Sequence, residues 1–469
     1  MPSPVSLTEL AEALKSETTV VLDVRPIDAW NGWQLQDEAR GGHAVGAAPF
    51  PTRWLEELEG GNLTAELAAR GAAPGSSVVV YGYGRDDAAA AAEKLEALGL
   101  GPVRVFEDGL AAWAADPNRP MSGLTRFRQL VHADWVATLL DGGSPAHHDG
   151  RRHVLAHVAF DSRADYDEGH IPGAVFLDTL FIERPEDWNR RTPEELEAAL
   201  SGLGITHDTT VVVYGRTGRP TMEMPHPGRA AGQIAARRAA WLLMYAGVQD
   251  VRVLHGGVGA WLRSGRTLTT EETKPVPVPE FGAAVPARPE LIVDTPEAKE
   301  MLASANADLV SMRSWEEFIG EFSGYHYVGP KGRIPGAVFG NCGSDAYHME
   351  NYRNHDQTMR SYHEIESRWA EAGVTVNKHV AFYCGTGWRA SEAAFCAHLM
   401  GWGRVSVYDD GWFVWSMDEK NPVAGGIPDG YEGTGRPPGL LRADPVSEES
   451  MGRVVAGVRP DRPPEDCSG

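Results

Sequence analysis

Cysteine is scarce in this chain. Its 469 residues include four cysteines, Cys342, Cys384, Cys396 and Cys467, and none belongs to a Cys-x-x-Cys pair. So few thiols exclude a disulfide framework and give no sign of a metal site. We therefore expect no metal and no cofactor, and a cysteine with a function must act through its own sulfur.

Positive charge and long apolar runs are also lacking. The chain has 43 Lys and Arg residues against 65 Asp and Glu residues, a formal net charge of -22. This excess argues against nucleic acid or an anionic membrane surface as a partner. No apolar run reaches the roughly 18 residues of a membrane-spanning helix. The first residues show no basic stretch followed by an apolar one, so we expect a cytoplasmic location.

What the chain does have is a threefold internal repeat. Each copy opens with an apolar run that ends near a polar residue and an arginine, at 20–25, 158–163 and 308–313. A turn through a Gly-Ala pair follows, at 42–47, 169–174 and 332–337. A second apolar strand comes next, at 77–82, 210–215 and 379–384, and a short strand and a tryptophan close each copy. The repetition predicts three domains of one fold.

The pattern within each copy predicts the fold class. Short β-rich runs alternate with Ala-rich helical stretches, which favours an α/β fold with three tandem domains, each a parallel sheet flanked by helices. The predicted domains are 1–122, 123–272 and 286–424, and residues 425–469 form a Pro/Gly-rich tail. Cys467 lies in this tail, and we expect it to be incidental. The stretch 216–227 lengthens the loop after the second strand of the second copy, where an interdomain contact is the expectation.

Cys384 lies at the turn between a buried strand, 379–383, and a helix, 390–400. The intervening residues Gly385, Thr386, Gly387, Trp388 and Arg389 can curl around the sulfur with their N–H groups pointing inward, and two glycines permit that path. The start of a helix adds partial positive charge and free N–H donors. This arrangement favours a thiolate or a persulfide anion at Cys384.

Only one copy can be catalytic. The position of Cys384 is taken by Gly82 in the first copy and by Gly215 in the second, and neither is a nucleophile. The strand end of the third copy is Ser311, where we align Asp23 and Asp161 of the other copies. Tyr81, Tyr214 and Tyr383 precede the loop in each copy, and strand-end packing is their expected role, although Tyr383 is also a candidate for contact with substrate.

The third copy has polar insertions that the other two lack. Residues 322–331 precede its Gly-Ala turn, and Tyr325 within them is a candidate for presenting a phenol to the substrate, with packing over the loop as the alternative. Asp345 and His348 are weaker candidates for an acid or base. Arg389 either contacts an anionic donor or, as we favour, ties the loop to a carboxylate by a bidentate bond. Trp388 either walls the pocket or packs in the core.

The pattern Cys-x-x-x-x-Arg after a strand resembles the active-site loop of rhodaneses, and all three copies resemble rhodanese domains. The loop is one residue shorter than that of the Cys-x5-Arg phosphatases, which by resemblance implies a pocket for sulfur rather than phosphate. The resemblance implies a sulfurtransferase that carries sulfur as a Cys384 persulfide, from thiosulfate or a polysulfide to a small nucleophilic acceptor.

The finer resemblance leaves the acceptor open. The motifs Ser-Gly-Tyr-x-Tyr, Gly-Ser-Asp-x-x-His-Met-Glu and Tyr-Cys-Gly-Thr-Gly-Trp-Arg look like those of bacterial triple-domain rhodaneses. The same loop type occurs in rhodanese-type ergothioneine synthases, which would imply sulfur insertion into the imidazole of hercynine. An aromatic pocket would suit its trimethylammonium group. A third alternative is a relay that passes sulfur to a cysteine of another protein.

Overall fold

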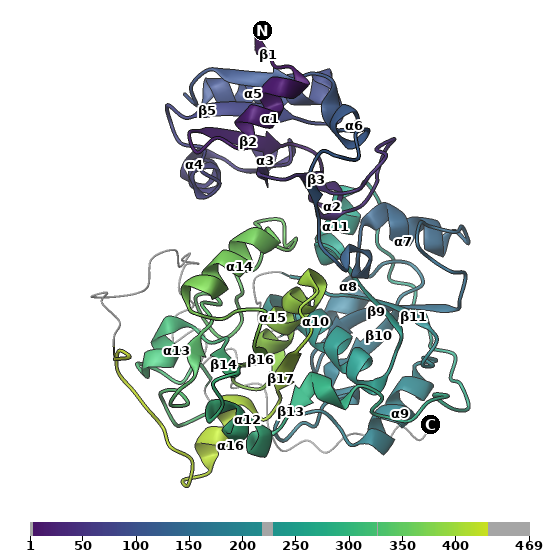
Figure 1. Ribbon diagram of the computed structural model, residues 1–469. Coiled ribbons are helices and arrows are strands. Elements are labelled where there is room, and N and C mark those ends of the chain that lie inside the picture. Colours follow the sequence, from purple (N-terminus) through teal and green to yellow (C-terminus); the bar gives the residue numbers. More distant parts are fainter. Residues whose placement is uncertain (1–2, 218–227, 326, 430–469) are drawn as a thin grey trace. The chain divides into compact units, whose positions relative to one another are not determined.

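The computed structural model describes residues 3–217, 228–325 and 327–429, and Figure 1 shows its elements along the chain. Two expectations fall outside these residues: the tail beyond residue 429 with Cys467, and the part of the second loop at 218–227. Residues 1–128 form one compact unit, and residues 129–469 form another. Among the helices of the described residues, none is long and apolar enough to cross a membrane.

The first unit contains one five-stranded parallel sheet in the order β1-β6-β5-β2-β4, and a two-stranded antiparallel pair, β3-β7. Its strands are β1 (Ser3–Pro4), β2 (Thr19–Asp23), β3 (His43–Ala44), β4 (Ala47–Pro49), β5 (Ser77–Tyr81), β6 (Val103–Phe106) and β7 (Met121–Ser122). Its helices are α1 (Leu7–Ala13), α2 (Ile27–Asn31), α3 (Trp54–Glu57), α4 (Gly60–Ala69), α5 (Arg85–Ala97) and α6 (Gly109–Ala114).

Strand β5 shows why its residues form a central strand. Its β-branched run is buried on both faces, as expected where helices cover both sides of a parallel sheet. Val78 and Val80 join the core beneath helices α3, α4 and α5, whereas Val79 and Tyr81 join the core beneath α1 and α6. Side chains therefore alternate between the two helical layers, as strand geometry requires.

The second unit contains two further five-stranded parallel sheets of the same topology, β8-β12-β11-β9-β10 and β13-β17-β16-β14-β15. The first of these belongs to the second copy, with β8 (Leu130–Val131), β9 (His153–Ala159), β10 (Val175–Asp178), β11 (Thr210–Tyr214), β12 (Asp250–Leu254), α7 (Ala133–Leu140), α8 (Ala164–Glu168), α9 (Pro193–Gly202), α10 (Gly228–Ala246) and α11 (Gly257–Arg263). The predicted α/β fold with three repeated sheets is confirmed.

The third copy is built from β13 (Ile292–Val293), β14 (Ala307–Ser311), β15 (Val338–Phe339), β16 (His379–Tyr383), β17 (Val405–Tyr408), α12 (Thr295–Leu302), α13 (Trp315–Ile319), α14 (Tyr362–Glu371), α15 (Trp388–Met400) and α16 (Gly411–Met417). Helices α10 and α15, the long helices of the second and third copies, pack against each other (Figure 1). The candidate residue Cys384 therefore lies in a domain whose helix α15 packs against helix α10 of the second copy.

One part of the predicted alignment is wrong. The sheets pair the strand-end tyrosines with one residue each: Tyr81 with Asp23, Tyr214 with His157 and Tyr383 with Ser311. Asp161 is not the counterpart of Asp23, because β9 ends at Ala159 and Asp161 lies beyond it. The letters Asp-Ser-Arg resembled Asp-Val-Arg of the first copy, but hydrogen bonds with β11 fix the register four residues earlier.

The predicted alignment is also wrong for the arginine of the opening run in the second copy, because Arg163 does not do what Arg25 and Arg313 do. Arg25 and Arg313 donate to the carbonyl oxygens of Gly42 and Gly332, which begin the Gly-Ala turns. In the second copy this bond comes from Arg216 of the lengthened loop, which donates to Gly169 at 2.6 Å. The side chain of Arg163 is instead 44% exposed. The second copy therefore makes the same hydrogen bond to the turn from the loop after β11, and not from the residues after β9.

Candidate active site

Cys384 follows β16 directly, and α15 begins four residues later at Trp388. The helix starts two residues earlier than predicted, because Gly387 takes a left-handed conformation with φ +84° and caps it. Two carbonyl oxygens of the loop are held from outside, since the N–H of Trp412 donates to Cys384 at 2.8 Å and the N–H of Phe413 donates to Gly385 at 2.9 Å. The start of α16 thus fixes the outer side of the loop.

The backbone N–H groups of the loop have no such contact among the described residues. Within the described residues, no protein acceptor takes the backbone N–H of any residue from Gly385 to Arg389. These donors lie at, or just before, the N-terminus of the 13-residue helix α15, a place in a fold that can bind anions. The side chain of Cys384 is fully buried beside them. Cys384 is thus the thiol that lies next to this group of donors.

In the first and second copies, Gly82 and Gly215 stand at the position of Cys384, and different groups lie against these two glycines. In the first copy the carboxylate of Asp87 accepts the N–H groups of Tyr83 at 2.7 Å and Gly84 at 3.0 Å. A Cβ at Gly82 would lie 2.1 Å from that carboxylate, so the protein's own anion fills the loop. In the second copy a Cβ at Gly215 would lie 1.9 Å from the carbonyl oxygen of Gly232. A side chain at either glycine would therefore require these neighbours to move.

Arg389 is the most heavily bonded residue of the site. Its two terminal nitrogens donate to both carboxylate oxygens of Glu317 at 2.8 and 2.9 Å, and Nη1 also donates to the carbonyl of Asp345. The pair is fully buried. Burial opposes ionisation of Glu317, but Arg389 and then Arg313 outweigh it and hold the pKa of Glu317 below its usual value. Arg389 therefore ties the loop to α13 by the bidentate geometry that we favoured.

Tyr325 lies directly over the loop. A Cβ at Gly385 would be 2.2 Å from its ring, and its hydroxyl oxygen accepts a hydrogen bond from Arg389 at 3.0 Å. Burial raises the pKa of Tyr325 well above its usual value, because the nearby positive charge of Arg389 offsets the effect of burial only in part. The phenol therefore keeps its proton and can donate it in a hydrogen bond.

Further aromatic side chains surround Tyr325. This aromatic cluster consists of Tyr325, Tyr327, Tyr347, Phe413 and Trp188. Trp188 comes from the second copy, and its ring stacks on Tyr327 with the ring centres 4.4 Å apart. Burial also raises the pKa of Tyr327 well above its usual value, and the charge of Cys384 contributes. The aromatic cluster beside Tyr325 is thus supplied by two copies of the repeat.

The remaining candidates from the sequence fall in three places. Trp388 turns toward the second copy, where its Nε1–H donates to Glu183. Thr386 is buried in the loop. Tyr383 is buried on β16 with its ring centre 6.2 Å from Tyr408, away from the aromatic cluster, which matches a strand-end position. Asp345 and His348 bond each other at 2.7 Å.

The other buried thiols are poor nucleophiles. Burial raises the pKa of Cys342 to about 12 and that of Cys396 to about 12. Cys342 is held by Arg389, whose Nη1 lies 3.6 Å from the sulfur. In the described part of the chain no group of three His, Cys, Asp or Glu side chains could hold a metal ion.

Sequence reasoning missed Glu317, Glu183 and Trp188. Glu317 carried a signal, because Ser314-x-x-Glu317 is a capping box at the start of α13, and both bonds of that box are present. The box does not reveal that the same carboxylate also binds Arg389. Glu183 and Trp188 carried no local signal, since they lie about two hundred residues before the loop in a domain without a nucleophile.

Comparison with known proteins identifies the family. The Rhodanese-like domain model matches residues 6–116, 132–264 and 294–418. Thiosulfate sulfurtransferase YnjE of Escherichia coli (strain K12) is 38% identical over 418 residues, which cover 88% of this chain and 91% of that protein. Human 3-mercaptopyruvate sulfurtransferase is 28% identical over 296 residues, which cover 62% of this chain and 92% of that protein.

Two solved structures are also similar to this chain, in fold and in sequence. A complex of an EanB variant with ergothioneine has a TM-score of 0.88 and 47% identity, covering 91% of this chain and 100% of that chain. The anaerobic ergothioneine biosynthesis enzyme from Chlorobium limicola, in complex with trimethyl histidine, gives the same four values. The match of three family segments and of two relatives over most of the chain is decisive. The chain belongs to the rhodanese family, and it is a sulfurtransferase of the rhodanese type.

Proposed function

We propose that Cys384 carries sulfane sulfur as a persulfide. The Cys384 thiolate attacks the outer sulfur of thiosulfate, a bond to that sulfur forms, and the sulfur–sulfur bond of the donor breaks to release sulfite. The negative charge then lies on the terminal sulfur of the persulfide, and a nucleophilic acceptor takes that sulfur and restores the thiolate. The observation that supports this proposal is the set of loop N–H groups, from Gly385 to Arg389, that have no acceptor in the part of the chain that the structure describes.

The cover over Cys384 shapes access to it. The thiol is fully buried, and Tyr325 lies against the loop at Gly385. A donor must therefore displace part of the aromatic cluster to reach the sulfur. This cover also keeps water away from the persulfide, which strengthens the interaction between its charge and the loop N–H groups.

A second candidate concerns the acceptor. The Tyr325 hydroxyl accepts from Arg389, and in the described residues its own hydrogen has no protein acceptor, so it can donate to a ring nitrogen of an imidazole. The aromatic cluster offers π faces to a trimethylammonium group. Both features suit trimethylhistidine, the ligand of one of the similar enzymes. Sulfur would insert at the ring carbon between the nitrogens, and the hydrogen of that carbon would move to nitrogen, giving a thione without a further oxidant.

The test separates the two half-reactions. The protein is incubated with thiosulfate, a polysulfide or 3-mercaptopyruvate, and intact mass should rise by about 32 Da, one sulfur atom, with at least one donor. The persulfidated protein is then mixed with cyanide, trimethylhistidine or a thiol-containing protein. Formation of the thione supports the imidazole acceptor, thiocyanate alone supports a general small-molecule transferase, and transfer only to a protein thiol supports a relay.

Tyr325→Phe sharpens this test. The variant keeps the ring over Gly385 but loses the hydroxyl, so persulfide formation and transfer to cyanide should be retained, whereas transfer to the imidazole should fall. A change by about a factor of 10² is typical when a proton donor is removed. Equal rates of thione formation in the variant and the wild-type protein would contradict a role for the phenol.

A further inference from the structure

The second domain has no nucleophile, yet it holds the catalytic loop of the third domain. Its contacts gather in the segment 183–190 and on α10. Glu183 is fully buried and accepts the Nε1–H of Trp388 at 3.0 and 3.1 Å with its two oxygens. Trp388 is the first residue of α15 and belongs to the loop after Cys384. A side chain of the silent domain thus holds the far end of that loop.

Glu183 is itself held on the other side. Nε of Arg238, on α10, donates to Glu183 at 2.6 Å. The same guanidinium forms an ion pair with Asp409 at 2.6 Å. All three side chains are fully buried, so these charges interact with little screening by water. The carboxylate of Glu183 is therefore fixed in one orientation, and so is the indole that it binds.

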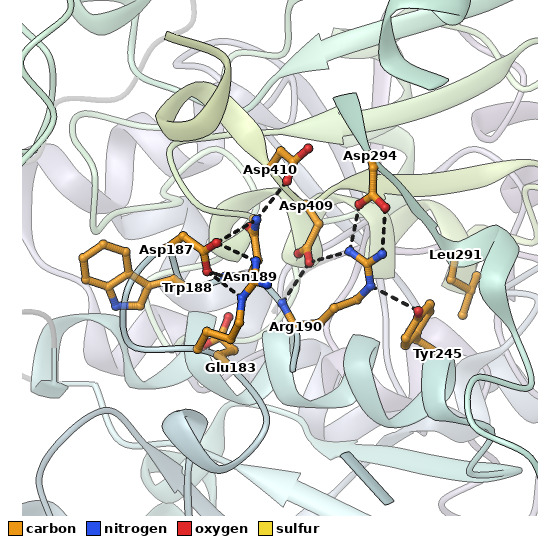
Figure 2. A network of polar contacts seen from close by, with 12 residues as sticks. Glu183, Asp187, Trp188, Asn189, Arg190, Tyr245, Leu291, Asp294, Asp409 and Asp410 are labelled. Atoms are coloured by element: carbon orange, nitrogen blue, oxygen red, sulfur yellow. Dashed lines mark hydrogen bonds and ion pairs between the residues drawn. The ribbon is translucent and has the colours of Figure 1, made fainter. Parts of the chain in front are cut away.

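A second set of contacts from the second domain reaches the element on the outer side of the loop. Figure 2 shows Arg190 between Asp294 and Asp409, with Nη1 2.8 Å from Asp294 and 3.2 Å from Asp409. The neighbouring Asn189 donates to Asp410 at 2.9 Å (Figure 2). Asp409 and Asp410 immediately precede α16, whose N–H groups hold the carbonyl oxygens of Cys384 and Gly385. The second domain therefore holds the start of α16, and α16 in turn holds the loop at Cys384 and Gly385.

We propose that the second domain is a positioning part of the active site, and that Glu183 is its main positioning residue, acting on the catalytic loop through Trp388. This inference rests on the proposed function of that loop. In chemical terms, a copy of the repeat that has no nucleophile keeps the loop N–H groups of another copy in the geometry that accepts a sulfur anion. Glu183 does not touch the reacting atoms.

Two variants of Glu183 test the proposal. Glu183→Leu removes both the acceptor of the indole N–H and the partner of Arg238, whereas Glu183→Gln keeps an oxygen for the indole. A displacement of the loop by about 1 Å costs on the order of 10²-fold in rate. We expect Glu183→Leu to slow persulfide formation at saturating thiosulfate by roughly tenfold or more, and Glu183→Gln to restore most of that loss.

A matched control lies at the other end of the same helix. Gln129, also outside the third domain, bonds His398 at 2.7 Å near the end of α15. Trp388 and His398 are ten residues apart, about 15 Å along a helix. Gln129→Leu removes a contact across the same domain boundary without touching the loop. It should leave the rate of persulfide formation unchanged.

Hydrogen exchange gives a readout that does not depend on activity. Peptides that contain Trp412 and Phe413, whose N–H groups donate to the carbonyl oxygens of Cys384 and Gly385, should exchange their amide hydrogens faster in Glu183→Leu than in the wild-type protein, and not in Gln129→Leu. Trp388→Phe, which removes the indole N–H, should reproduce the effect, and adding Glu183→Leu to it should slow the reaction little further. If Glu183→Leu does not fold, Trp388→Phe alone carries the test.

Two results would overturn the proposal. One is a Glu183→Leu protein with the persulfide rate and the exchange of the wild-type protein. The other is a Gln129→Leu protein that is slowed as much as Glu183→Leu. Failure of the proposed function would look different, since the wild-type protein would form no persulfide at all while the exchange measurements could still be compared among variants.

Discussion

Replacing Gly385 by alanine tests the close contact between the loop and Tyr325. The backbone of Gly385 is not in the left-handed region, so alanine itself suits the chain there. The added Cβ, however, would lie 2.2 Å from Cε2 of the Tyr325 ring, where ordinary contact begins at 3.4 Å. The ring must therefore move by roughly 1.2 Å, or the loop must move instead.

A shift of this size disturbs the groups that act on the sulfur acceptor. The hydrogen bond from Arg389 to the Tyr325 hydroxyl is 3.0 Å long, and a displacement of about 1 Å takes it beyond hydrogen-bond range. Misplacement of a reacting group by about 1 Å can cost on the order of 10²-fold in rate. We expect Gly385→Ala to slow sulfur transfer by about that factor, while the folded domain is retained.

The assay is a single turnover. The protein is persulfidated with thiosulfate, freed of excess donor and mixed with trimethylhistidine, and the loss of one sulfur is followed by intact mass. Gly403→Ala is the control, because a Cβ there has no atom within 4 Å. If Gly385→Ala does not fold, Gly385→Ala combined with Tyr325→Leu should restore folding by removing the clash. Transfer by Gly385→Ala within about twofold of wild type, under roughly 0.5 kcal/mol of barrier, would refute the reasoning.

Three further predictions follow from buried charges and from the closed first loop. Glu317→Gln leaves the guanidinium of Arg389 buried without its carboxylate, so the free energy of unfolding should fall by about 3–5 kcal/mol in urea titrations, and a loss under about 1 kcal/mol would contradict the buried pair. Asp345 outweighs the effect of burial and raises the pKa of His348, so this pair stabilises the fold fully below the ordinary histidine pKa and the contribution is lost as pH rises through the raised value. The ring of His348 should titrate above about 6.5 by NMR and drop in Asp345→Asn; a wild-type midpoint at or below that value would contradict the pairing. Gly82→Cys should add no second persulfide, because the loop that receives it is already filled by a carboxylate, and a gain of two sulfur atoms in intact mass would show the opposite.

The sequence was sufficient for the repeat and for the local setting of Cys384. The strand predicted at 379–383 is β16, because Val380, Phe382 and Tyr383 suit a buried strand of a sheet. The helix was predicted two residues late, since its first turn begins at Trp388 only because Gly387 adopts a left-handed conformation. Local signals therefore placed Cys384 correctly between a strand and a helix.

What the sequence could not provide was partners across long separations. Trp388 was left between a pocket wall and the core, and its hydrogen-bond partner Glu183 lies in another copy of the repeat. No periodicity or spacing rule connects residues so distant. The misalignment of Asp161 has a related cause: three similar letters outweighed the strand register, which depends on hydrogen bonds to β11 and is not written in the run itself.

The most direct measurement maps the sulfur after loading. The protein is treated with thiosulfate, blocked with an alkylating reagent and digested, and each cysteine-containing peptide is examined for an added sulfur atom, with Cys384→Ser treated in parallel. A sulfur of about 32 Da on the Cys384 peptide, absent from Cys342 and Cys396 and from every peptide of the variant, is the predicted result. A persulfide on another cysteine, or sulfur transfer that persists in Cys384→Ser, would contradict the account.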